Sequence, residues 1–361
     1  LLWWFGAAGN EIRLHVDHLY HETAILVFVV LSLAGIAYLK RRIAWSDLAQ
    51  VVLLLLPVMI GVAVFTYADP NLAHPFANWG LSSWLLAFLL QYWLLKNFET
   101  DWNAIVRSYW HLGTFWLLVL IVTWEAAWLA REAMPAAHTW YKVVWAIVPT
   151  LTVALMPVAH RKLEWPLKRF ETLYMGTGIA PLAGLIALWA MYASFQPGDP
   201  APLSYVPIVN PLELTQLFVL ITSFFWLQQR HIYISDQLRW YSSYAVAFLI
   251  LNSIIARAMH FYGDIPFDID ALWQSPHYQT AVSIIWTLTA FLIMVSATRL
   301  KQRISWVMGS VLLGAVVIKL FLVDLADIGT IARIVSFVVV GLLILLIGYL
   351  SPLPPRVKEQ S

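Results

Sequence analysis

The 361-residue sequence contains no cysteine and few charged residues. Without cysteine it cannot form disulfides, use a thiolate nucleophile or bind a metal through sulfur. Charged residues make up 12% of the chain, half the level of about 25% found in soluble domains, whereas 61% of residues are hydrophobic. No glycine-rich nucleotide loop, Walker A motif, nucleophile elbow or zinc signature is present. We therefore expect a chain surrounded by membrane lipids, with no nucleic-acid partner and no cofactor.

Apolar runs long enough to cross a bilayer recur along the chain. They predict eleven membrane helices, at residues 23–39, 46–67, 80–96, 111–130, 141–158, 174–195, 213–228, 240–260, 279–297, 304–324 and 332–350, and residues 1–8 resemble the end of a twelfth. The sequence therefore predicts an all-α, polytopic transmembrane helical bundle of about 11–12 spans. We expect residues 1–361 to form a single transmembrane domain.

The basic residues are distributed unequally between the two sides of this topology. Of the 22 Lys and Arg residues, sixteen fall in loops on one side and six on the other. Basic loops stay in the cytoplasm, so we expect the C-terminus to be cytoplasmic and the protein to be multi-pass in a bacterial inner membrane. Because the chain begins with Leu1 inside an apolar stretch, we expect it to be the C-terminal part of a longer chain, with the remaining N-terminal part as a partner.

Four charged residues lie at the tip of the last predicted hairpin: Lys319, Asp324, Asp327 and Arg333. Ionisable groups at the edge of an apolar helix need partners. Asp324 and Asp327 are three residues apart and share a helix face, with Arg333 opening the next helix. The cluster either closes the hairpin as a salt-bridged clamp or binds an anion or relays protons, and the balance of charge favours the clamp.

A second group follows the predicted span 240–260. Arg257 and His260 are i, i+3 neighbours at its outer end, and Asp264, Asp268 and Asp270 follow in the loop. A histidine that faces carboxylates suits general acid–base chemistry, and Asp with His also suits a metal. The structural alternative is a hydrogen-bonded cap at the membrane interface.

The segment 11–22 offers a weak candidate metal site. If it forms one helix, His15, His18 and Glu22 lie on the same face. No HExxH motif is present, so a mixed-charge helix that enters the membrane is the preferred interpretation.

Glu125 is a carboxylate inside the predicted span 111–130. A carboxylate in such a position marks either a transport pathway or an ion pair. The candidate basic partners are Arg131 nearby and Arg257 or Lys319 from other helices.

Several motifs in the C-terminal third resemble domain-of-unknown-function family 2339, a family of large polytopic bacterial membrane proteins. They are RAMHFY (257–262), the segment 275–279, SIIW (283–286), KLFLVDL (319–325), RIVSF (333–337), GLLILLIGY (341–349) and SPLPP (351–355). The resemblance is specific over about residues 256–356 and implies a longer parent chain with more helices. The resemblance implies no activity. The positions that recur in the family are also candidates on physical grounds: Arg257, His260, Gln279, Lys319, Asp324 and Arg333.

These observations favour a transporter or flippase-like protein for an envelope lipid or saccharide, with an outward-facing polar pocket. The candidate pocket residues are Arg257, His260, Gln279, Lys319, Asp324, Arg333 and Glu125. Two alternatives stay open. One is a membrane-embedded enzyme that modifies an envelope polymer at the outer face, with His260 and an Asp as acid and base. The other is a structural or assembly subunit.

Overall fold

The computed structural model describes residues 2–43, 45, 48–229, 235–320, 334, 338–342 and 344–346. These residues are overwhelmingly helical and contain no β-strand. The predicted fold class, an all-α polytopic helical bundle, is confirmed. The chain divides into two compact units, which we describe separately.

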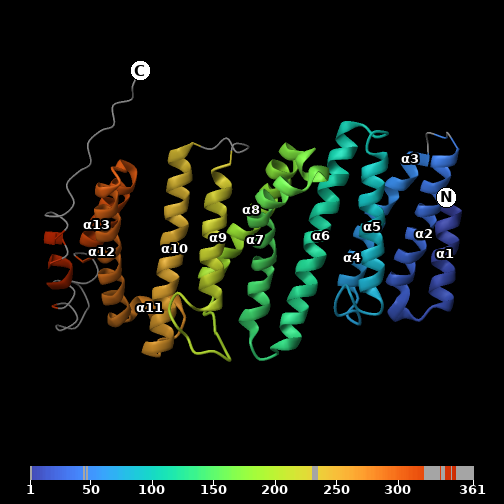
Figure 1. Ribbon diagram of the computed structural model, residues 1–361. Helices are drawn as coiled ribbons and strands as arrows, with labels where there is room; N and C mark the ends of the chain where they lie inside the picture. Colours follow the sequence, from blue (N-terminus) through green and yellow to red (C-terminus); the bar gives the residue numbers. More distant parts are fainter. Residues whose placement is uncertain are drawn as a thin grey trace, which may run out of the picture. The chain divides into compact units, whose positions relative to one another are not determined.

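Unit 1 comprises the described parts of residues 1–190, 199–203 and 215–233. Its elements are α1 (Leu2–His15), η1 (His18–Tyr20), α2 (His21–Arg42), α3 (Leu48–Val51), η2 (Val52–Leu54), α4 (Leu55–Ala68), α5 (Gly80–Phe98), α6 (Ala104–Ala133), α7 (His138–Lys162), η3 (Glu164–Lys168), η4 (Thr172–Gly178) and most of α8 (Ile179–Ser194) and α9 (Pro211–Leu227). Figure 1 labels the longer elements along the chain.

Two apolar clusters form the interior of unit 1. The first joins α2, α4, α5 and α6, with Leu33, Met59 and Leu95 among its fully buried members. The second joins α6, α7, η4, α8 and α9. Helix α6 contributes to both clusters, so it is the central element of this unit. Its N-terminus is capped by Asn103, whose side chain accepts from the backbone N–H of Val106.

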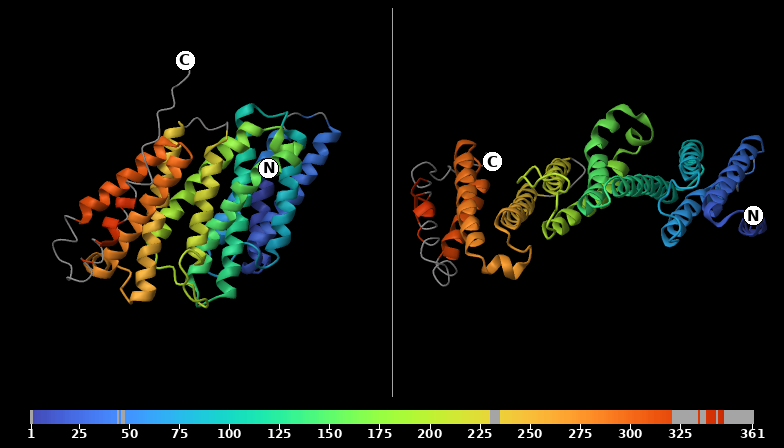
Figure 2. Two further views of the ribbon diagram at one scale, coloured as in Figure 1. Left: turned by 60° about the vertical axis from the view of Figure 1, so that its left-hand side comes forward. Right: turned by 90° about the horizontal axis from the view of Figure 1, so that it is seen from below.

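Unit 2 comprises residues 191–198 and 204–214 with the described residues from 235 onward. It contains α10 (Asp236–Gly263), α11 (Ile269–Gln274), α12 (Pro276–Arg299) and α13 (Arg303–Lys319). Ser235 and Ser275 cap α10 and α12, and Pro276 occupies the first turn of α12, as helix starts prefer. Helices α12 and α13 pack side by side, as Figures 1 and 2 show.

Within the described residues, seven helical segments are long and apolar enough to cross a membrane, as judged by length and composition. They are His18–Arg42, Leu48–Ala68, Ala104–Ala133, His138–Lys162, Thr172–Ser194, Asp236–Gly263 and Pro276–Arg299, and the shorter Pro211–Leu227 is also apolar. The last two predicted spans, 304–324 and 332–350, lie partly outside the described residues. The total of eleven or twelve spans and the single-domain organisation stay predictions.

Candidate functional site

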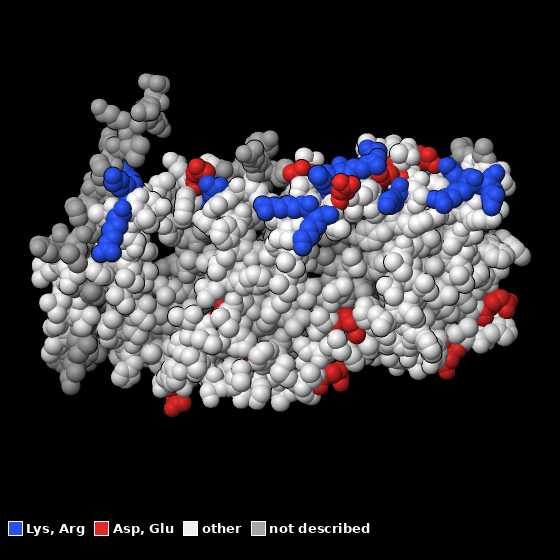
Figure 3. Space-filling model, viewed as in Figure 1, with Lys and Arg blue, Asp and Glu red and all other residues white. Residues whose placement is uncertain are grey.

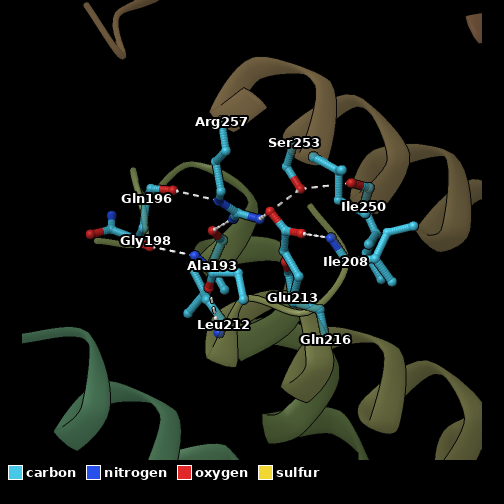
Figure 4. A network of polar contacts seen from close by, with 12 residues as sticks. Ala193, Gln196, Gly198, Ile208, Leu212, Glu213, Gln216, Ile250, Ser253 and Arg257 are labelled. Atoms are coloured by element: carbon cyan, nitrogen blue, oxygen red, sulfur yellow. Dashed lines mark hydrogen bonds and ion pairs between the residues drawn. The ribbon is translucent and has the colours of Figure 1, made fainter. Parts of the chain in front are cut away.

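Among the residues that the structure describes, the largest fully buried side chain is that of Arg257 on α10, shown in Figure 4. Its Nε donates to the carbonyl oxygen of Gln196 at 3.0 Å, and Nη2 donates to that of Ala193 at 2.5 Å. Its Nη1 donates to Ser253 Oγ at 3.4 Å and lies 3.5 Å from Glu213 Oε1. Arg257 and Glu213 are both 0% exposed. The guanidinium is therefore surrounded by acceptors from the protein itself.

Glu213, in the first turn of α9, is the centre of the same network. Its carboxylate accepts from the Tyr205 hydroxyl at 2.8 Å and from the backbone N–H of Ile208 at 2.5 Å. Ile208 has a φ of 72°, which is rare for a β-branched residue, and this hydrogen bond helps to hold it there. Burial and the hydrogen bond to Glu213 raise the pKa of Tyr205, so its hydroxyl stays a donor. The network ties the segment between α8 and α9 to α10.

Lys319 and Gln279 form a separate cluster between α12 and α13. Lys319 Nζ donates to the backbone carbonyl of Gln279 at 3.1 Å and to Ser283 Oγ at 2.8 Å. The Gln279 side chain donates to the carbonyl of Trp273 at 2.8 Å. The described contacts of this cluster and those of Arg257 have no residue in common, so these members of the expected pocket divide between two structural networks.

His260, the remaining candidate that the structure describes in the C-terminal third, has its own described contact. His260 Nδ1 lies 2.8 Å from the backbone carbonyl of Ile265, which agrees with the alternative of an interface cap. Asp268 accepts from two backbone N–H groups as the cap of α11, so the described contacts do not include a His260–Asp pair. Asp324, like Asp327 and Arg333 beside it, lies outside the described residues.

Glu125 is buried in α6 and has a partner that the sequence analysis did not consider. His74, from the segment between α4 and α5, places Nδ1 2.9 Å from both carboxylate oxygens. The backbone N–H of Phe76 donates to Glu125 Oε2 at 3.1 Å. The imidazole stacks on the Trp128 ring with centroids 3.5 Å apart. In the part of the chain that the structure describes, the contacts of this carboxylate therefore come from an imidazole and a backbone amide, and not from Lys or Arg.

A second carboxylate–histidine pair lies near the start of α6, and the sequence analysis missed it. Glu99 Oε2 accepts from His111 Nε2 at 3.1 Å and from Trp165 Nε1 at 3.2 Å, and Arg169 lies 3.1 Å from Oε1. His111 Nδ1 lies 2.9 Å from the Tyr174 hydroxyl. Glu99 and His111 are at most 1% exposed. The sequence did contain a signal for this pair: His111 opens the apolar run of the predicted span 111–130, and Glu99 follows the end of the predicted span 80–96.

The two pairs lie on one face of α6. His111, Thr114 and Glu125 are three and eleven residues apart, spacings that return to the same side of a helix, and His111 and Glu125 are about 21 Å apart along the axis. Between them Gln91 Nε2 donates to Thr114 Oγ1 at 3.0 Å. Buried Ile121 interrupts the polar face. Unit 1 therefore contains an interrupted column of titratable and polar groups.

The helix on which the candidate metal site depended does not form. Helix α1 ends at His15, His18 begins a short 3₁₀ turn, and Glu22 belongs to α2. His15 pairs with Glu11, and His18 with Asp69. Asp17 breaks the helix because its side chain accepts from the backbone two residues on. Among the described residues, no group of three His, Cys, Asp or Glu could hold a metal ion.

The chain matches the model of the family described as Predicted membrane protein (DUF2339) over residues 1–354. The match extends far beyond residues 256–356, where the sequence motifs suggested the same family. No curated protein and no solved structure matches the chain.

Proposed function

The chain belongs to the DUF2339 family of predicted membrane proteins, and from this premise we propose that it is a proton-coupled transporter of the flippase type. Its proposed substrate is an envelope lipid or a lipid-linked saccharide. We further propose that it lies in a bacterial inner membrane, with the basic helix ends and the C-terminus on the cytoplasmic side. Unit 1 then carries the proton, through the carboxylate–histidine pairs on the polar face of α6.

The observation that carries this proposal is the pair formed by Glu125 and His74. A carboxylate held by Arg or Lys keeps its charge throughout the physiological range. A histidine ring can take up and release a proton, so a carboxylate–imidazole pair can pass a proton on. Buried Asp, Glu and His groups with this property serve as proton carriers in membrane transporters.

The pair formed by Glu99 and His111 supports the same proposal. It lies at the opposite end of the polar face of α6, so each end of the helix holds a group that can bind a proton. Ile121 lies between them and is buried, which separates the two ends in this conformation. Transfer of a proton along α6 therefore requires a conformational change, as expected for alternating access.

A structural or assembly role is the second candidate. It is favoured by the contacts of Arg257 and Lys319, since both cations bind groups of the protein itself. On that proposal, their removal lowers the amount of folded protein. The acid–base pair of the enzyme alternative has no comparable support, because His260 contacts a backbone carbonyl.

Reconstituted proteoliposomes test the transport proposal. Fluorescent phosphatidylglycerol and phosphatidylethanolamine serve as lipid probes, dithionite reports which leaflet they occupy, and an internal dye reports proton movement under an imposed pH gradient. We expect lipid movement that accelerates with the gradient and is accompanied by proton flux. Glu125→Gln is expected to abolish both, because the amide cannot exchange a proton.

Glu132→Gln is the matched control. It makes the same substitution on the same helix at an exposed position, and we expect wild-type rates from it. Equal proton flux in the Glu125→Gln and wild-type proteins would refute the proposed role of this carboxylate. Loss of folded protein without loss of activity per molecule would favour the structural role instead.

A further inference from the structure

Three cations surround two aromatic rings at the basic end of unit 1. Lys96 Nζ, from the last turn of α5, lies 5.8 Å from the centroid of Trp165. The guanidinium carbons of Arg107 on α6 and Arg169 after η3 lie 5.6 Å and 5.7 Å from the centroid of Phe170. We call Lys96, Arg107, Trp165, Arg169 and Phe170 the basic–aromatic cluster. His111 connects its rings, at 6.0 Å from Trp165 and 4.6 Å from Phe170.

The cluster has more positive charge than the neighbouring carboxylates neutralise. Glu99 pairs with Arg169, and its other oxygen is already held by two ring N–H groups. Arg107 Nε is buried without a hydrogen-bond partner in the described structure. Of the other carboxylates described at this end, Asp101 pairs with Lys40 and Glu171 with His160, and the described ion pairs do not include Glu164. Lys96 and Arg107 therefore remain available to an anion.

The chemistry of the cluster selects a phosphate group. A guanidinium presents two parallel donors that match two phosphate oxygens, and an ammonium adds a third donor. The rings hold the cations in place and limit their hydration. Basic clusters between membrane helices on the cytoplasmic side bind anionic lipid headgroups, and Figure 3 shows Lys and Arg gathered along the edge where α5 ends and α6 begins.

Neighbouring apolar residues favour a lipid over a free phosphate. Trp93, one turn before Lys96 on the same face of α5, is 37% exposed, and Leu163 just before η3 is 51% exposed. Such residues at the end of a membrane span face acyl chains. A phospholipid can therefore place its phosphate on the cations and its chains against these side chains at the same time.

We infer that the basic–aromatic cluster is a binding site for the phosphate of an anionic phospholipid headgroup. Arg169 is the cation that can change partner, because its side chain is 57% exposed whereas that of Glu99 is 1% exposed. When Arg169 turns to the phosphate, Glu99 keeps its bonds to His111 and Trp165. This inference holds whether or not the protein transports lipid. If it does, the site receives the headgroup beside the proton-binding pair of Glu99 and His111.

Lipid binding to purified, delipidated protein tests the inference by native mass spectrometry. Phosphatidylglycerol and phosphatidylcholine are titrated separately, and inorganic phosphate is added as a competitor. We expect phosphatidylglycerol to bind at least tenfold more tightly than phosphatidylcholine. The Lys96→Gln/Arg107→Gln variant is expected to lose this preference. The control Arg161→Gln/Lys162→Gln removes the same charge from exposed residues at the same end and is expected to retain it.

Three results would overturn the inference. Equal binding of the two lipids would show that no headgroup site exists, and equal losses in the two double variants would show that diffuse charge is responsible. Displacement of the lipid by millimolar inorganic phosphate would assign the site to free phosphate.

A second measurement leaves the cluster intact. Because the chain has no cysteine, Ser108→Cys carries a single fluorophore beside Arg107. Brominated phosphatidylglycerol should quench it more than brominated phosphatidylcholine, and equal quenching would contradict the inference.

Discussion

Replacement of Arg257 by methionine should be among the most destabilising single changes in unit 2. Methionine fills similar volume but leaves the Glu213 carboxylate buried without its cation. Removing one member of a buried ion pair costs about 3–5 kcal/mol, because the remaining charge is uncompensated. The carbonyl oxygens of Ala193 and Gln196 also lose a charged donor. We therefore expect Arg257→Met to reduce the free energy of unfolding by about 3–5 kcal/mol.

The measurement is thermal and denaturant unfolding of detergent-purified protein, followed by circular dichroism. Arg239→Met is the control, because Arg239 lies on the same helix and pairs with the largely exposed carboxylate of Asp236. Because the carboxylate of this pair is exposed to solvent, the pair contributes about 0–1 kcal/mol. Activity per folded molecule should be the same in both variants, since Arg257 acts on stability.

A double-mutant cycle completes the test. Arg257→Met combined with Glu213→Leu removes both charges, so the double variant should be more stable than the sum of the two single changes predicts. A destabilisation by Arg257→Met no larger than that of Arg239→Met would refute the reasoning. So would strict additivity in the cycle, because it would mean that the two charges do not interact.

Other predictions concern backbone fit, pH and the second basic cluster. Gly80→Ala should destabilise unit 1 by about 1–3 kcal/mol, because a Cβ there would lie 2.0 Å from the carbonyl oxygen of Pro75. Gly61→Ala is the control, because nothing lies within 4 Å of the added Cβ. In thermal unfolding, Gly61→Ala should be neutral or stabilising. Tyr205→Phe should cost about 1 kcal/mol at pH 7. The folded-state pKa of Tyr205 is raised, so the stabilisation by its hydroxyl is complete below pH of about 10 and declines at higher pH. The melting temperatures of the wild-type and Tyr205→Phe proteins should therefore converge at high pH. A difference that stays constant with pH would contradict this. Lys319→Met should cost about 1.5–3 kcal/mol by loss of its two described acceptors, and an unchanged melting temperature would exclude that role.

The carboxylate–histidine pairs show how far sequence reasoning reaches in this chain. The position of Glu125 inside an apolar run was enough to identify a buried carboxylate that needs a partner. The partner itself could not be predicted, because His74 lies 51 residues away in a segment between two helices. A cation is the simplest partner for a carboxylate to recognise in a sequence, because its charge is opposite, so Arg131, Arg257 and Lys319 were the expected partners. A histidine is neutral or charged according to its surroundings, which the sequence does not show.

The sequence by itself determined the all-helical membrane fold and the family. These properties depend on local composition, because an apolar segment in lipid must satisfy its own backbone hydrogen bonds and so becomes a helix. Tertiary structure alone decided that Arg257 is enclosed with Glu213, that Lys319 joins a different network, and that Glu99 and His111 meet beside three cations. Each of these contacts joins residues from different helices or loops. Their geometry depends on helix packing, which local composition does not specify.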